Sequence, residues 1–179
     1  MNDNDLWMAK YSDKLLREVG IKTDQVVLDF GCRIGNYSIP SAKIVGENGC
    51  VYALDSNKDS LCELMKISEQ YGLKNIESIE ISEEPKIPLP DGSVDVVLLF
   101  DVIHLINDRE RLYKEVFRVA REHALVSVLP KHFREYMKMS LEDVKCEIDK
   151  IFGFQETFFR LINHDDKLQK GHIFNFRKI

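Results

Sequence analysis

Short apolar segments alternate with amphipathic helical segments along most of the chain, and this alternation limits the fold more than any other feature. We predict strands at residues 26–30, 50–54, 76–81, 94–100 and 124–129. We predict helices at residues 6–19, 36–45, 57–71, 110–121 and 141–152. Strands that alternate with helices build an α/β protein around a parallel sheet.

The last part of the chain breaks this alternation. Residues 154–162 and 171–179 are predicted to be two more strands, joined by a polar loop at 163–170 with no helix between them. This pattern adds an antiparallel strand to an otherwise parallel sheet of seven strands. With 179 residues, we expect a single domain over residues 1–179, in which residues 1–24 form a helical lid or cap and residues 25–179 form the core.

Charge and cysteine content exclude several classes of function. The formal net charge is −5, which argues against a general nucleic-acid binder or a protein that binds anionic membranes. The N-terminus is polar and acidic, unlike a signal peptide, and no apolar run is long enough to cross a bilayer. The four cysteines form no C-x-x-C pair, so we expect reduced thiols in a cytoplasmic protein.

The segment VVLDFGCRIGNY is the main candidate for a ligand-binding turn. Its strand ends at Asp29, glycines follow at 31 and 35, and a helix then begins, so backbone N–H groups face a ligand. A dinucleotide turn needs G-x-G-x-x-G, but Arg33 and Asn36 occupy the second and third glycine positions. A turn with an acidic residue suits a positively charged ligand better than a polyphosphate. The alternative is an ordinary strand–helix turn.

A second acidic residue, Asp55, follows the second predicted strand. A carboxylate at this place in a doubly wound fold accepts hydrogen bonds from the ribose hydroxyls of a nucleoside. The alternative is a solvated strand end or a helix cap.

Three segments together, VLDFGCRIGNY, VYALD and LPDGSVDVVLLFDVIHLI, resemble class I S-adenosylmethionine-dependent methyltransferases of the small methyltransferase-domain type. The resemblance implies a Rossmann-like, doubly wound domain with strand order 3-2-1-4-5-7-6 and an antiparallel last strand. It also implies S-adenosylmethionine as cofactor and S-adenosylhomocysteine as product.

The resemblance also implies which residues bind the cofactor. They are Asp29, Gly31, Cys32 and Gly35 for the methionine part, Asp55 for the ribose, Ser56, Asn57, Glu83 and Glu84 for the adenine, and Asp101 below the transferred methyl group. For Glu83 and Glu84 the alternative is a pair of solvated loop acids.

The acceptor side has fewer candidates. His104 is a candidate general base for an oxygen acceptor, because histidine titrates near neutral pH; its alternative role is to line the pocket. Trp7 and Tyr11 lie on one face of the first helix and are candidates for the substrate pocket, or else pack against the core. The other histidines have no metal-ligand spacing, so we predict no metal site. We interpret His164-Asp165-Asp166 as a solvated turn; the alternative is a weak metal cluster.

These observations favour a methyltransferase acting on a small-molecule acceptor, since the chain has few residues beyond the minimal fold. One alternative is a non-catalytic protein that binds the cofactor weakly or not at all and acts through a protein partner. Its main support is Arg33, a bulky cation in the glycine turn. A nucleotide-dependent oxidoreductase is a third reading, which the turn sequence disfavours.

Overall fold

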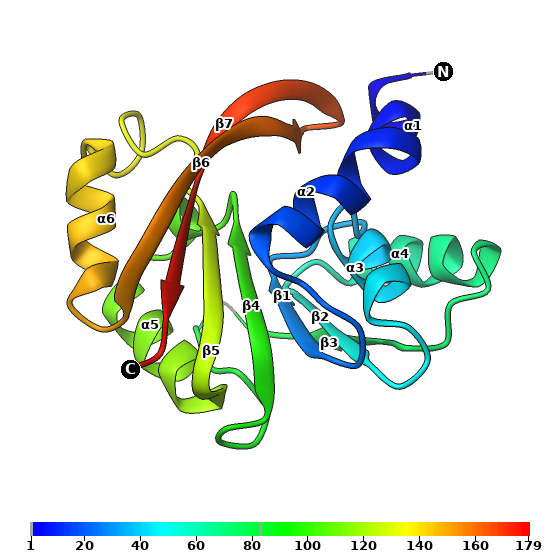
Figure 1. The fold of residues 1–179 in the computed structure, drawn as a ribbon, viewed down its shortest axis with the longest axis horizontal. Helices are drawn as coiled ribbons and strands as arrows, with labels where there is room; N and C mark the ends of the chain where they lie inside the picture. The colour runs from blue at the N-terminus through cyan, green and yellow to red at the C-terminus, as the bar shows by residue number, and fades with distance from the viewer. Residues whose placement is uncertain (1, 83) are drawn as a thin grey trace.

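The computed structural model describes residues 2–82 and 84–179, and within them seven strands form one sheet of order β3-β2-β1-β4-β5-β7-β6 (Figure 1). The strands are β1 (Val26–Phe30), β2 (Cys50–Asp55), β3 (Ile76–Glu80), β4 (Val94–Phe100), β5 (Ala120–Leu129), β6 (Gly153–His164) and β7 (Lys167–Arg177). Strands β1 to β5 are parallel, and β7 is antiparallel to both β5 and β6. The predicted fold class and strand order are therefore confirmed.

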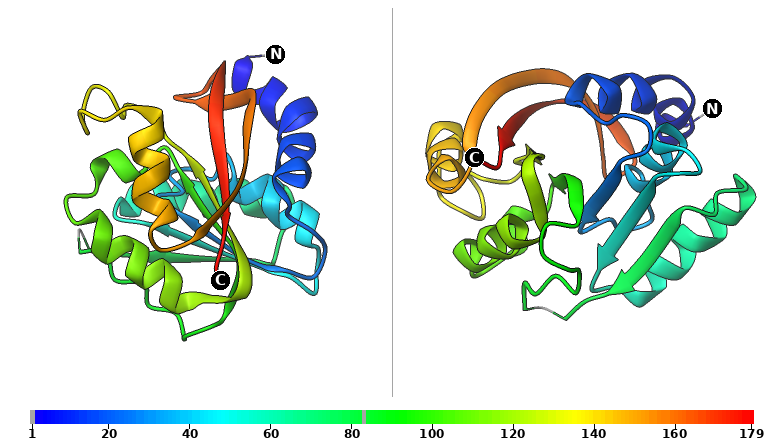
Figure 2. Two further views of the ribbon diagram at one scale, coloured as in Figure 1. Left: turned by 60° about the vertical axis from the view of Figure 1, so that its left-hand side comes forward. Right: turned by 60° about the horizontal axis from the view of Figure 1, so that its bottom comes forward.

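Helices cover both faces of this sheet. They are α1 (Asp3–Leu6), the π-helical turn η1 (Trp7–Tyr11), α2 (Ser12–Val19), α3 (Ser38–Val45), α4 (Lys58–Gln70), the 3-10 turn η2 (Ile103–Leu105), α5 (Arg109–Val119) and α6 (Leu141–Asp149). The segment from α1 to α4 lies on one side of the sheet and α5 and α6 lie on the other (Figures 1 and 2). In the described part of the chain no helix has the length and apolarity needed to span a membrane.

The central strand β4 shows why two helical layers are required. Along β4, Val96 and Leu98 pack with the α1–α4 layer, whereas Val97 and Leu99 pack with α5 and α6. All four side chains are completely buried. Because successive strand residues point to opposite faces, an uninterrupted apolar strand has to be covered on both sides.

Two asparagines near the starts of helices have different roles. Asn57 caps α4, where its side-chain oxygen accepts a hydrogen bond of 3.0 Å from the Ser60 N–H. Asn36 does not cap the next helix, because α3 begins only at Ser38. The Asn36 amide instead donates a hydrogen bond of 3.0 Å to Asp166, at the tip of the C-terminal hairpin.

This hairpin corrects the predicted polar loop at 163–170. After a register shift between Phe154 and Glu156, strands β6 and β7 pair continuously up to His164 and Lys167, so only Asp165 and Asp166 form the turn. Both have positive φ angles, 50° and 59°, which is the conformation of a type I′ turn. Since β5 pairs only with the last part of β7, the rest of the hairpin leaves the sheet and arches over the carboxyl ends of the central strands (Figure 1).

We expect Gly31→Ala to lower the free energy of unfolding by about 2–4 kcal/mol. Two costs add up in this value: alanine in a left-handed backbone conformation, and an extra methyl group in a packed region. Gly31 has a φ of +78°, and an added Cβ would lie 2.5 Å from the Val102 side chain. Gly92→Ala is the matched control, because Gly92 also has a positive φ, +58°, but an added Cβ would meet nothing within 4 Å. Urea unfolding measures both losses, and equal losses would contradict the steric argument.

Candidate functional site

The turn after β1 joins the carboxyl ends of β1 and β2. The N–H groups of Gly31 and Cys32 donate to the Leu54 carbonyl at 2.7 and 3.0 Å, which folds the turn back onto the end of β2. The Gly35 N–H then donates to the Cys32 carbonyl at 2.9 Å and closes the turn. As a result, the two acidic residues at the ends of these strands, Asp29 and Asp55, flank one turn, because the carboxyl ends of neighbouring parallel strands lie at the same edge of the sheet.

Asp55 is held by backbone N–H groups on both sides of its carboxylate. Its Oδ2 accepts a hydrogen bond of 2.8 Å from the Arg33 N–H, and its Oδ1 accepts one of 2.8 Å from the Asn57 N–H. A carboxylate has about four lone-pair sites, so both oxygens can accept a further bond. This arrangement presents a fixed, ionisable acceptor pair to a ligand with neighbouring hydroxyl groups.

Asp29 is the more deeply buried of the two acids, with only 2% of its surface exposed. Burial raises the pKa of its carboxyl group to about 7; the Ser38 hydroxyl, which donates to Oδ2 at 2.5 Å, opposes this increase, and the charge of Asp55 adds to it. A buried carboxylate of this kind is stabilised by a cation. The site therefore fits a ligand with an ammonium group, such as the methionine part of S-adenosylmethionine.

The Arg33 side chain points away from the two acidic residues of this site. Its guanidinium group lies 2.9 Å from the Asp165 carboxylate at the hairpin tip, and more than half of its side chain is exposed. Its backbone has a φ of 49°, the left-handed conformation that a glycine usually supplies. The residue thus keeps the glycine-like shape of the turn while its side chain contacts the hairpin.

Arg33→Gly is expected to leave the free energy of unfolding within about 1 kcal/mol of the wild type, because the lost ion pair is exposed and glycine tolerates this φ. We expect S-adenosylhomocysteine affinity to change by less than about threefold, since both Asp55 hydrogen bonds from backbone N–H groups remain. Thermal unfolding and ligand titration measure the two quantities. An affinity that rises tenfold or more would show that the guanidinium obstructs the site.

At the end of β4, Asp101 lies between two histidines. Nδ1 of His104, on η2, is 3.6 Å from Asp101 Oδ1, and Nδ1 of His164, at the end of β6, contacts Asp101 Oδ2. Burial lowers the pKa of His104, which keeps its ring neutral at neutral pH. His164 was predicted to be part of a solvated turn, but its side chain is 90% buried.

Trp7 is enclosed in the core. It is completely buried, its indole N–H donates to the Asn36 carbonyl at 2.8 Å, and its ring packs edge-on against Tyr37. This geometry matches the packing alternative for Trp7, and Tyr11 packs half-buried against the same core. The Tyr37 hydroxyl donates to the Asn163 carbonyl at 2.7 Å and so ties the glycine turn to the hairpin. Tyr37 lies in no motif of the sequence that would indicate this role.

The described residues proposed for the adenine side have side chains that are exposed or already hydrogen-bonded. Ser56 is exposed, and the Asn57 side chain is used as the helix cap. Glu84 is exposed and pairs with Arg111 at 3.2 Å, and Glu83 lies outside the described residues. The contacts of Ser56, Asn57, Glu83 and Glu84 with adenine therefore stay predictions.

Cys32, proposed for the methionine part of the cofactor, has a buried thiol, and burial raises the pKa of this thiol.

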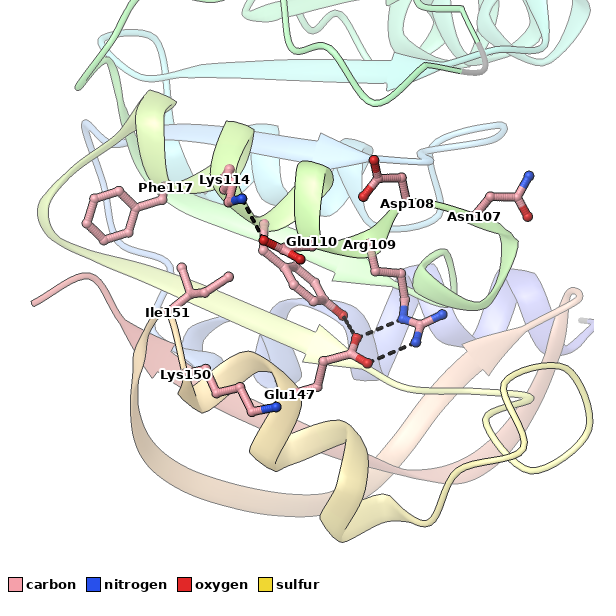
Figure 3. A pocket seen from close by; sticks show the side chains of 10 residues that line it. Asn107, Asp108, Arg109, Glu110, Lys114, Phe117, Glu147, Lys150 and Ile151 are labelled. Carbon is pink, nitrogen blue, oxygen red and sulfur yellow. Dashed lines mark hydrogen bonds and ion pairs between the residues drawn. The ribbon is translucent and has the colours of Figure 1, made fainter.

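A hollow of about 830 Å³ lies between α5 and α6, away from these residues (Figure 3). Its polar groups bind one another: Arg109 makes two hydrogen bonds to Glu147, of 2.7 and 2.8 Å, and the Tyr113 hydroxyl makes a third. Because these groups are already partnered, we interpret the hollow as the junction of two helices and not as the site.

Residues 21–171, most of the chain, match the sequence model of a protein family described as the methyltransferase domain. Among solved structures, a SAM-dependent methyltransferase from Aquifex aeolicus is similar, with a TM-score of 0.76 and 25% identity; the match covers 94% of this chain and 90% of that one.

The names of two curated relatives state a small-molecule substrate. A sterol 24-C-methyltransferase of Aspergillus fumigatus is 25% identical over 89% of this chain, and a demethylmenaquinone methyltransferase of Lactobacillus johnsonii is 27% identical over 93%. The matched region is 46% of the first relative and 65% of the second, so the chain spans only part of the length of either.

Proposed function

The chain belongs to the methyltransferase-domain family, and on this basis we propose that it transfers a methyl group from S-adenosylmethionine to a small-molecule acceptor. The observation that carries the proposal is the pair of strand-end acids, Asp29 and Asp55, on either side of one glycine turn. One acid is buried and favours a cation, and the other is fixed by two backbone N–H groups. This combination fits an ammonium group and a ribose in one ligand.

In this proposal each residue binds or orients a part of the ligand. Asp29 accepts hydrogen bonds from the ammonium group, and the Gly31 to Gly35 turn allows the ligand to approach the backbone. Asp55 accepts hydrogen bonds from the ribose hydroxyls. When bound, S-adenosylmethionine supplies a methyl carbon that its sulfonium already activates for displacement.

The acceptor is placed at the end of β4, beside Asp101 and His104. Aligning the acceptor with the methyl carbon supplies most of the rate, since orientation alone contributes as much as about 7–11 kcal/mol. For an oxygen acceptor, the neutral ring of His104 accepts the proton that the acceptor loses. A thiol or amine acceptor needs less help from a base.

A small acceptor is supported by two observations. The named relatives act on a sterol and on demethylmenaquinone. In addition, the hairpin tip and the N-terminal helical segment are joined over the glycine turn by hydrogen bonds, including one of 2.7 Å between Asn163 and Asn4, which limits access from that side. A macromolecular acceptor would have to reach past this cover.

The experiment is a labelled transfer with a cell extract. The protein is incubated with methyl-labelled S-adenosylmethionine and the extract, and the label is then followed in low-molecular-mass, protein and nucleic-acid fractions. We expect label in the low-molecular-mass fraction, and none there with Asp55→Ala. Label in the protein or nucleic-acid fraction would overturn the small acceptor, and no transfer by protein that binds the cofactor would overturn the activity.

A further inference from the structure

Two buried ligand atoms face each other at the end of β4 with no hydrogen-bond partner. They are Asp101 Oδ1 and His104 Nδ1, and neither has a partner among the described residues. The distance between them is 3.6 Å, which is too long for a hydrogen bond. Burying a polar atom without a partner destabilises the fold, so a pair of such atoms facing each other needs an explanation.

We propose that Asp101, His104 and His132 bind one divalent transition-metal ion, Zn²⁺ or an ion of similar preference, beside the cofactor-binding edge of the sheet. One ligand atom from each of these residues lies within 4.8 Å of the others. Two ligands of a tetrahedral Zn²⁺ are roughly 3.4 Å apart, given bonds of about 2.0–2.2 Å. Asp101 and His104 are already close to this spacing, with 3.6 Å between Oδ1 and Nδ1.

His132 is oriented for this role by a carboxylate. Its Nδ1 lies 3.4 Å from Glu135, which leaves Nε2 free to bind a metal. A carboxylate that holds the second ring nitrogen is the usual arrangement around a metal-bound histidine. His132 also has a φ of 55°, an uncommon conformation outside glycine, so the backbone bends to bring this ring beside that of His104, 4.9 Å away.

His164 positions the proposed ligand Asp101. Its Nδ1 contacts Asp101 Oδ2, which leaves Oδ1 directed to His104. His104 and His132 follow β4 and β5, and His164 is the last residue of β6. These three strands run in the same direction, since β7 is antiparallel to both β5 and β6, so their carboxyl ends lie at one edge. The expectation of no metal site rested on spacing along the sequence, which does not reveal such a cluster.

The chemistry of the three side chains selects the ion. Imidazole nitrogens with one carboxylate favour zinc or iron(II) over calcium or magnesium, which prefer oxygen ligands alone. Three protein ligands leave at least one position open, as in catalytic and not structural sites. About a third of the His132 side chain is exposed, so the cluster borders on solvent at this residue. In the metal-bound protein His104 is a ligand and not the proton acceptor of the metal-free site.

The test is a titration of the full chain, freed of metal with a chelator, with Co²⁺ followed by visible absorption and with Zn²⁺ as competitor. We expect one ion per chain. His132→Ala should weaken binding by more than about 100-fold, beyond the effect of an outer partner, and Glu135→Gln by about 10-fold with the Co²⁺ spectrum retained. Because no methyl donor is present, the result is independent of the proposed transferase activity.

His172→Ala is the matched control, since His172 lies on β7 against Phe159 and outside the cluster. It should bind Co²⁺ as the wild type does. The proposal is overturned if the wild type binds no ion, if His132→Ala binds as tightly as the wild type, or if His172→Ala loses as much affinity as His132→Ala.

Discussion

Asp55→Ala is expected to weaken S-adenosylhomocysteine binding by at least about 100-fold while the protein remains folded. Hydrogen bonds to a charged group contribute about 1.5–3 kcal/mol each, and two ribose hydroxyls lose their acceptor. The substitution also removes the group that fixes the Arg33 N–H, so the turn loses part of its preorganisation. Equilibrium dialysis with labelled ligand measures the affinity, and circular dichroism checks the fold.

Asp59→Ala controls for the loss of one negative charge near the same helix. Asp59 is exposed on the first turn of α4, four positions after Asp55. Its replacement should leave the affinity within about twofold of the wild type, because an exposed charge is screened by solvent and salt. If both variants bind equally well, Asp55 does not hold the ribose.

Asp29→Asn should change how stability depends on pH. The folded carboxyl has a pKa of about 7, raised from 3.8, so the folded state holds a proton that the unfolded state has lost. The wild-type free energy of unfolding therefore falls as the pH rises from about 4 to about 7 and then levels off. Asparagine carries no such proton, and the stability of the variant relative to wild type should increase by about 3 kcal/mol between pH 5 and pH 8.

Urea unfolding at both pH values tests this expectation. Asp59→Asn is again the control, and its stability should follow the wild type across the range. Parallel curves for Asp29→Asn and the wild type would mean that the buried carboxyl is not protonated in the folded state. The same variant should also bind S-adenosylmethionine more weakly, because a neutral amide cannot attract the ammonium group as a carboxylate does.

The sheet could be predicted because most of its strands are short, strongly apolar segments of the sequence. The strand β4 was predicted with its observed bounds, Val94–Phe100, since an apolar run of this length has to be covered on both faces. The positions of Asp29 and Asp55 could also be predicted, because parallel strands place their carboxyl ends at one edge. Their burial could not, since it depends on how α3 and the hairpin close over that edge.

The hairpin tip and the histidine cluster show where sequence patterns fail. Two aspartates in succession are a fair signal for a type I′ turn, but the polar residues around them favoured a longer loop. His104, His132 and His164 are far apart in the chain and meet only because β4, β5 and β6 are parallel and the hairpin bends over them. A search for polar residues that follow each strand would have found this signal.

The cofactor site is tested most directly by calorimetric titration of the wild-type chain with S-adenosylmethionine and, separately, with S-adenosylhomocysteine. We expect one binding site per chain, with a Kd in the micromolar range for both ligands, and loss of this binding in Asp55→Ala. If folded wild-type protein binds neither ligand, the two acids and the glycine turn do not form a cofactor site, and the proposed activity is wrong.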